Sequence, residues 1–214
     1  LQLQRTIPVL SIIEDETSVA VRNQYEENPY PRWVNTSIEP IPYRISHFLT
    51  RTKLLGLSNY DHFSDKPQIL VAGCGTGQNA IASASCFKDS QVTAIDLSLS
   101  SLGYAKRKTK EFGLQNIKYL QGDILCISRL QKTFDIIECV GVLHHMSEPK
   151  VGLGILTDVL KPGGLMKLGL YSSCARRWIN KIRAQIIETG LKATRADMIK
   201  LRQSIMETND INFQ

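Results

Sequence analysis

The sequence lacks the features of a membrane or secreted protein. Its longest predominantly apolar runs, such as residues 136–143, are far shorter than the roughly 20 residues that a membrane-spanning helix needs. Residues 1–20 do not show the basic and then apolar pattern of a signal peptide. We therefore expect a soluble, cytoplasmic protein with no membrane partner.

Paired cysteines, internal repeats and a starting methionine are also missing. The 5 cysteines include no C-x-x-C pair, so the sequence indicates neither a disulfide framework nor a metal site of that kind. No repeat or low-complexity segment is visible. Because the chain begins with leucine, we expect it to be a fragment of a longer protein or a processed form.

The composition fits a globular domain with or without an added arm. Of 214 residues, 43% are hydrophobic and 21% are charged, which excludes a wholly disordered chain. The net charge of +6 arises near the C-terminus, where residues 161–214 hold 10 Lys/Arg and 4 Asp/Glu. Such a segment can attract nucleic acid or another anionic partner, but its scattered charges favour a solvated helix face.

From residue 67 onward, strand-length apolar runs alternate with segments of helical spacing. Several runs are apolar at consecutive positions, as in central strands of a parallel sheet covered on both faces. The alternation predicts an α/β fold with a doubly wound, mostly parallel, Rossmann-like sheet that stops after strand five. The expected strands are 68–72, 91–95, 117–120, 134–140 and 165–171, and the expected helices are 77–87, 98–112 and 150–160.

The segments on either side of this core differ from it. Residues 1–66, with tyrosines and prolines gathered between 25 and 43, predict an N-terminal arm or lid. After the fifth strand we expect only helices, over 174–189 and 196–208. The expected organisation is therefore an arm (1–66), a core (67–171) and a basic helical segment (172–214).

The sharpest motif is a strand that runs into Gly73, Gly75 and Gly77 and then into a helix. Alternate glycines let the backbone turn tightly and lie close to a ligand. A tight strand-to-helix turn without a ligand explains the same pattern, so the motif alone is weak evidence.

Asp96 ends the second expected strand, 19 positions beyond Gly77. A carboxylate there can accept hydrogen bonds from both hydroxyls of a ribose that lies across the crevice of the sheet. The alternative role for Asp96 is the N-cap of the following helix, which Ser98 could fill equally well.

The glycine spacing separates two kinds of cofactor. The dinucleotide motif G-x-G-x-x-G needs glycine or alanine at position 78, which is Gln78, so a nicotinamide oxidoreductase is disfavoured. The spacing G-x-G-x-G, followed by an acidic end of strand two, resembles the class I S-adenosylmethionine-dependent methyltransferases. The segments 121–124, 134–146 and 160–165 also resemble that family, the last as the turn before its fifth strand. The resemblance covers residues 67–171.

The resemblance implies S-adenosylmethionine as cofactor and S-adenosylhomocysteine as product. It places Asp123 near the adenine amino group and residues 134–146 under the methionine part. No metal is implied. The cofactor contacts that it implies are Gly73, Cys74, Gly75, Gly77, Gln78, Asp96, Leu97, Asp123, Ile124 and Val140.

Residues 25–33 carry a second resemblance, to the segment that precedes the methyltransferase domain in bacterial proteins with N-terminal tetratricopeptide repeats. Within them, Tyr25, Tyr30, Arg32 and Trp33 are candidates to close over the cofactor or contact the acceptor. Aromatic residues beside prolines equally often pin an arm to the core, so both interpretations stay open.

Two features depart from the family pattern, one residue and one missing element. Val71 stands where an acidic residue commonly faces the methionine end of the cofactor, and Gln78 or Arg32 would have to replace part of that contact. The hairpin that normally follows strand five is missing. Strand five would then be an exposed edge, which we expect to be covered by self-association or by the basic helices.

These residues predict methyl transfer to an unidentified acceptor by in-line displacement at the sulfonium methyl. His144 or His145 is the candidate general base, although a loop pair that does not titrate explains them as well. The alternative function is a non-catalytic module that binds the cofactor or a partner on the same fold.

Overall fold

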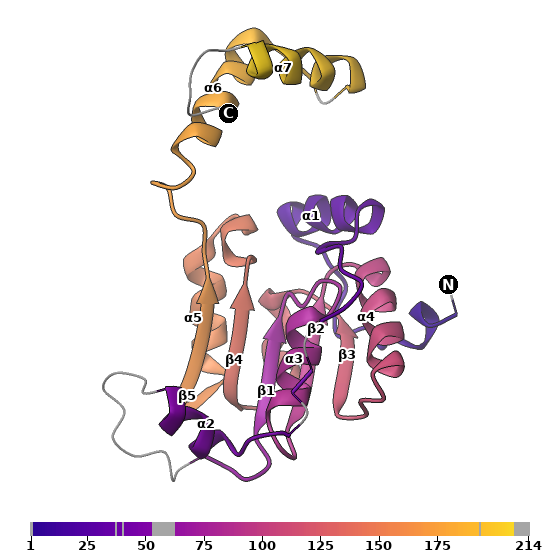
Figure 1. Ribbon diagram of the computed structural model, residues 1–214, viewed down its shortest axis with the longest axis vertical. Helices are drawn as coiled ribbons and strands as arrows, with labels where there is room; N and C mark the ends of the chain where they lie inside the picture. The colour runs from indigo at the N-terminus through magenta and orange to yellow at the C-terminus, as the bar shows by residue number, and fades with distance from the viewer. Residues whose placement is uncertain (1, 37, 40, 53–62, 193, 208–214) are drawn as a thin grey trace. The chain divides into compact units, whose positions relative to one another are not determined.

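Five parallel strands form one sheet in the order β3-β2-β1-β4-β5, as the computed structural model shows (Figure 1). The strand order reverses between β1 and β4, which is the doubly wound arrangement expected from the sequence. The predicted α/β, Rossmann-like fold is therefore confirmed. The strands are β1 (Gln68–Ala72), β2 (Gln91–Asp96), β3 (Ile117–Gln121), β4 (Phe134–Val140) and β5 (Leu160–Gly169).

The structure describes residues 2–36, 38–39, 41–52, 63–192 and 194–207. The chain divides into two units, Leu1–Leu170 and Tyr171–Gln214. The sheet belongs to the first unit.

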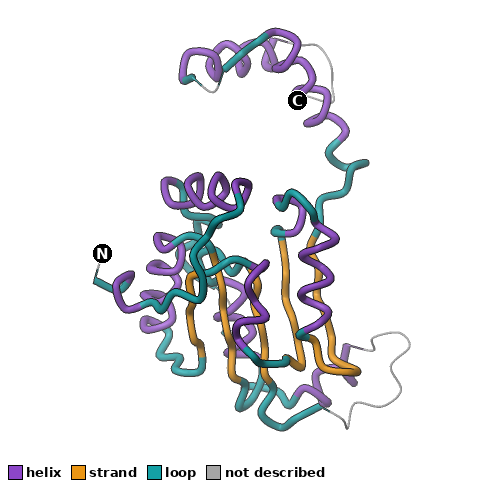
Figure 2. The backbone as a smooth tube through the Cα atoms, turned by 180° about the vertical axis from the view of Figure 1, so that it is seen from behind, coloured by secondary structure: helices purple, strands orange, loops and turns teal. Residues whose placement is uncertain are grey.

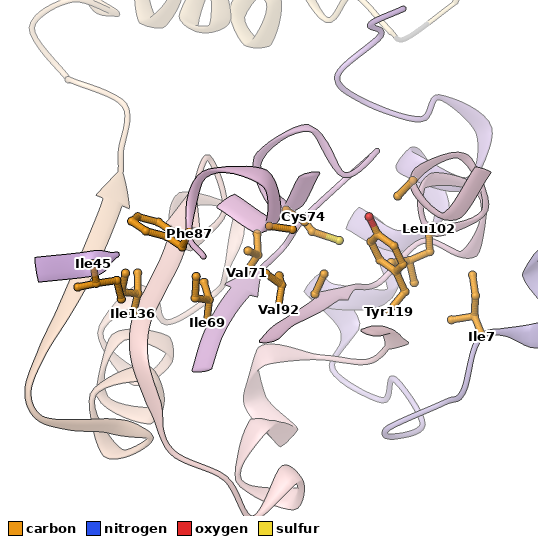
Figure 3. Close-up of a cluster of buried hydrophobic side chains, with 14 of the residues drawn as sticks. Ile7, Ile45, Ile69, Val71, Cys74, Phe87, Val92, Leu102, Tyr119 and Ile136 are labelled. Carbon is orange, nitrogen blue, oxygen red and sulfur yellow. The ribbon is translucent and has the colours of Figure 1, made fainter. Parts of the chain in front are cut away.

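Helices cover both faces of the sheet (Figure 2). On one face, α2 (Ile45–Thr52), α3 (Gln78–Cys86) and α4 (Leu99–Glu111) pack on β1 and β2 through residues such as Leu49, Ala80 and Leu102. Figure 3 shows this cluster, in which Ile69, Val71 and Ile136 lie between the strands and the helices. On the other face, η2 (Ile124–Leu130) and α5 (Pro149–Asp158) pack on Leu70 and Ile137. Burial on both faces explains the consecutive apolar positions in the strands.

The fifth strand corrects one prediction. We expected residues 160–165 to form a turn, but β5 begins at Leu160 and contains Pro162, Gly163 and Gly164. The pairing with β4 skips residues, from Phe134↔Leu160 to Ile136↔Leu165, so these residues form a bulge. Lys161 holds the bulge beside β4, since its Nζ lies 2.9 Å from the Asp135 carboxylate.

The N-terminal arm runs past the carboxyl ends of the strands. After η1 (Gln4–Thr6), Val9 forms a parallel bridge with Gln121 at the end of β3. The helix α1 (Glu16–Glu27) then lies beyond the carboxyl ends of the strands (Figure 1). Its first turn is capped by the Asp15 carboxylate, which accepts the Ser18 N–H at 2.8 Å.

The second unit holds α6 (Arg177–Thr189) and α7 (Arg195–Glu207). The helix predicted from residue 174 begins at Arg177, and Thr208, the predicted end of the last helix, lies outside the described residues. Neither helix has a buried residue. Within the part of the chain that the structure describes, no helix is long and apolar enough to cross a membrane.

Candidate functional site

The glycine motif forms the turn between β1 and α3. Gly73, Gly75 and Gly77 all have positive φ, of 73°, 53° and 88°, which a side chain would oppose. The N–H groups of Gly73 and Cys74 donate to the Ile95 carbonyl at 2.8 and 2.9 Å, so the turn is fixed to β2. Asp96 is the next residue of β2, which brings its carboxylate beside the turn.

The glycines also make room for neighbouring parts of the protein. A Cβ on Gly73 would lie 2.3 Å from Val142, and one on Gly75 would lie 2.4 Å from the Tyr30 carbonyl oxygen. A Cβ on Gly77 would lie 2.5 Å from Ala105. Close protein packing therefore accounts for part of the glycine requirement that the sequence attributes to a ligand.

Asp96 joins two turns at the carboxyl edge of the sheet. One carboxylate oxygen accepts the Gly75 N–H at 2.7 Å and the other accepts the Ser98 N–H at 2.9 Å. Burial raises the pKa of this carboxyl, and the nearby Glu26 adds to the rise, while the two N–H donors oppose it. The N-cap of α4 is Ser98, whose hydroxyl accepts the Ser101 N–H at 3.1 Å. Asp96 therefore stands beside the glycine turn, with each carboxylate oxygen bonded to a backbone N–H.

The ends of β3 and β4 supply further predicted residues. Asp123 is buried after β3 and its carboxylate accepts the Leu125 N–H at 3.0 Å. Ile124 is buried beside it, whereas Val140 at the end of β4 is 37% exposed. Leu97 follows Asp96, and its carbonyl accepts a hydrogen bond from Gln121 Nε2 at 3.0 Å. These positions line the same carboxyl edge as Asp96.

The two histidines lie in η3 (Leu143–His145), in the loop after β4. Their ring centroids are 4.4 Å apart. The ring of Tyr25, from α1, meets the ring of His145 edge-on at 6.2 Å. The arm and the loop after β4 therefore meet at His145.

The arm residues divide between the two interpretations left open by the sequence. Trp33 is buried, stacks 6.3 Å from Phe112 and donates its indole N–H to the Thr76 hydroxyl, so it pins the arm to the core. The Tyr30 side chain is 64% exposed, and Arg32 is exposed. Tyr25 is the arm side chain that contacts a predicted catalytic residue.

The residues expected to compensate for Val71 lie in different environments. Val71 is buried in the core beside β4, where it pairs with Glu138. Gln78 is half-buried at the start of α3, next to the glycine turn. Of these two residues, Gln78 is therefore the one that lies beside the glycine turn, and Arg32 is exposed on the arm.

Sequence analysis missed two residues that build this edge. The Glu26 carboxylate accepts the N–H groups of Leu99 and Ser100 at the start of α4, and Thr76 binds the arm through its N–H and its hydroxyl. Glu26 stands beside the predicted Tyr25 and Thr76 lies within the glycine motif, but nothing local indicates their partners. Among the described residues, no three histidine, cysteine or acidic side chains gather where they could hold a metal ion.

A comparison with protein families matches residues 69–164 to the methyltransferase domain. This segment contains the glycine turn, Asp96, Asp123 and both histidines. Over residues 69–164 the chain is similar to methyltransferase domains.

Two relatives of known sequence each match more than half of this chain. A ubiquinone biosynthesis O-methyltransferase of Idiomarina loihiensis is 28% identical over 134 residues, which are 62% of this chain and 54% of that protein. An uncharacterized protein of Synechococcus sp. is 35% identical over 122 residues, which are 56% of this chain and 29% of that protein. The chain thus spans between about a third and about half of these relatives.

A solved structure supports the methyltransferase fold. PKMT2 from Rickettsia typhi, in complex with AdoHcy, superposes with a TM-score of 0.62 at 22% identity. The match covers 81% of this chain and 34% of that one. The likeness shows that the two chains share a fold.

Proposed function

We propose that this chain binds S-adenosylmethionine at the carboxyl ends of β1, β2 and β3 and transfers its methyl group to an acceptor that meets the domain beneath the arm. The observation that carries the proposal is the position of Asp96. Its carboxylate is held beside a turn of three positive-φ glycines at the end of the adjacent strand. This is where a ribose lies on a doubly wound sheet.

The residues at this edge fit the parts of such a cofactor. Asp96 keeps lone pairs that can accept the ribose hydroxyls, because each of its oxygens accepts one N–H from the protein. Asp123, at the end of β3, would accept the adenine amino group, with Ile124 against the ring. Gln78 and the loop 141–146 would hold the methionine part. When bound, the cofactor supplies a methyl group that is already activated on a sulfonium.

The protein has mainly to hold the acceptor in line with that methyl group and exclude water. His145, which contacts Tyr25 of the arm, would accept a proton from the acceptor where the acceptor loses one. His144 lies beside it and is the second candidate.

The alternative function is a module that binds the cofactor or a partner without catalysis. Val71 favours it, because an apolar side chain occupies the place of a common cofactor contact. Turnover separates the two functions: release of S-adenosylhomocysteine with any member of an acceptor panel supports the enzyme, and binding without turnover across the panel supports the module.

The first experiment is a calorimetric titration with S-adenosylmethionine, S-adenosylhomocysteine and reduced nicotinamide dinucleotide. Micromolar binding of the first two alone is the expected result. Binding of the nicotinamide instead, or of none of the three, would contradict the proposal.

The wider organisation of the protein belongs to the same proposal. We infer an arm over residues 1–66, a core over 67–171 and a basic segment over 172–214, in a cytoplasmic protein whose N-terminus continues into tetratricopeptide repeats. The resemblance of residues 25–33 supports the repeats. The coding sequence upstream of Leu1 tests them, because each repeat has about 34 residues of recognisable pattern.

A further inference from the structure

The arm takes part in a closed ring of hydrogen bonds around the cofactor edge. At one end, the Glu26 carboxylate accepts the N–H of Leu99 at 2.7 Å and that of Ser100 at 3.0 Å. A few residues along the arm, the Tyr30 carbonyl accepts the Thr76 N–H at 3.2 Å. One short stretch of arm therefore contacts both the β2–α4 turn and the β1–α3 turn.

Asp96 joins the same two turns from the inside. It accepts the Ser98 N–H, directly before the residues that Glu26 holds, and the Gly75 N–H, directly before Thr76. The ring thus passes from Glu26 through the start of α4, Asp96 and the glycine turn back to Tyr30. These hydrogen bonds together oppose a change in the distance between the two turns.

Glu26 does more than cap a helix. Ser98 already serves as the N-cap of α4 through the Ser101 N–H. Glu26 comes from 73 residues away along the chain, and its negative charge lies close enough to Asp96 to raise the pKa of that carboxyl. This repulsion is offset by two hydrogen bonds from the positive end of α4, which are stronger because the acceptor is charged.

A second anchor holds the other end of the stretch. The Thr76 hydroxyl donates to the Pro31 carbonyl at 2.6 Å and accepts the Trp33 indole N–H at 2.9 Å. The arm is therefore fixed at Trp33 whatever happens at Glu26. Loss of Glu26 should loosen the part of the arm between α1 and Tyr30, where the Tyr25 carbonyl still accepts the Ser98 hydroxyl at 3.1 Å, and leave the Trp33 anchor in place.

We propose that Glu26 is a positioning residue of the cofactor site, which clamps the arm to α4 and so fixes the spacing of the two turns that Asp96 joins. This inference rests on the proposed function. Because coupling between two binding events is reciprocal, a cofactor held by Asp96 should in turn tighten the arm.

Calorimetric titration with S-adenosylhomocysteine tests the clamp on the full chain. Glu26→Ala should weaken binding at least about tenfold, because two charge-assisted hydrogen bonds are lost. Glu26→Gln should fall in between, since its amide oxygen can still accept one N–H. Glu27→Ala is the matched control, because Glu27 is the exposed neighbour on the same helix and its loss removes the same charge. It should bind like the wild type.

Hydrogen exchange supplies a readout that a purely structural role would not move. In the wild type, S-adenosylhomocysteine should slow amide exchange over residues 25–31, and in Glu26→Ala this slowing should disappear while β1 and β2 stay protected. Should Glu26→Ala not fold, Glu26→Gln carries both measurements.

The outcomes separate this inference from the proposed function. A wild-type chain that does not bind S-adenosylhomocysteine overturns both. Wild-type binding with an equal affinity in Glu26→Ala overturns the clamp alone, and so does an equal loss of affinity in Glu27→Ala.

Discussion

Trp33 donates its indole N–H to the Thr76 hydroxyl at 2.9 Å, which joins the arm to the glycine turn. The same indole stacks on Phe112 and meets Tyr104 edge-on. Tyr104 also donates its hydroxyl to the Trp33 carbonyl. The arm is thus packed as part of the hydrophobic core at this point.

Trp33→Ala should lower the free energy of unfolding by about 3 to 5 kcal/mol, the usual cost of removing a buried large aromatic side chain. Chemical denaturation measures it. Trp178→Ala, in α6, is the matched control. Trp178 is only partly buried, and its ring centroid lies 3.9 Å from Lys181 Nζ. It should cost no more than about 1 kcal/mol. Equal costs for the two variants would show that Trp33 does not anchor the arm.

Asp96→Ala should weaken binding of S-adenosylhomocysteine by about 1 to 3 kcal/mol, because the acceptors for the ribose hydroxyls are removed. Calorimetric titration measures the change. Asp158→Ala, at the exposed end of α5, should bind like the wild type. Circular dichroism has to show an intact fold, since Asp96 also accepts two backbone N–H groups. Unchanged affinity in a folded Asp96→Ala protein would remove Asp96 from the site.

Asp96 should also make stability depend on pH. Burial raises the pKa of Asp96 above its ordinary value of 3.8. At a pH between the ordinary and the raised pKa, the folded state therefore binds more protons than the unfolded state. The stability that Asp96 contributes is therefore fully present below the ordinary pKa and is lost as the pH rises through the raised one. Chemical denaturation at stepped pH should show that the free energy of unfolding of the wild type falls relative to that of Asp96→Asn as the pH rises through this window. A relative rise instead would contradict the raised pKa.

His145→Ala should lower the rate of methyl transfer by about 10²-fold or more where the acceptor needs a general base. Affinity for S-adenosylhomocysteine should change little, since the base acts on the acceptor. Release of S-adenosylhomocysteine across an acceptor panel measures the rate. His47→Ala, on the exposed side of α2, is the control. Equal rates for His145→Ala and the wild type would leave the histidines as a loop pair that does not titrate.

The end strand β5 should be covered in solution. Leu168, in β5, is 40% exposed, and Leu170, directly after the strand, is 58% exposed. We expect either self-association, which sedimentation at several concentrations would detect and Leu168→Lys would weaken, or slow amide exchange in a monomer covered by the basic helices. A monodisperse monomer in which β5 exchanges rapidly would contradict both.

Much of the domain follows from local sequence. The apolar runs that become β1 and β4 have the predicted bounds, because a strand buried on both faces needs apolar residues at consecutive positions. The glycine turn and Asp96 can also be recognised from local sequence. Glycine readily adopts a positive φ, and the end of an apolar run marks the end of a strand. The family resemblance rests on these local features.

Other features were decided by contacts between distant residues. The strand that includes Pro162 pairs with β4, where Lys161 contacts Asp135, 26 positions away. Ser98 and not Asp96 is the N-cap of α4, and Asp96 instead joins the N–H groups of Ser98 and of Gly75, the latter 21 positions away. Glu26 finds its partners 73 and 74 positions along the chain.

The sequence by itself therefore determined the sheet and its glycine turn, since these depend on periodic burial and on backbone conformation. The tertiary structure alone decided which side chains close the site. Hydrogen bonds between segments that fold together leave no periodic trace in the sequence, and the arm is held by such bonds.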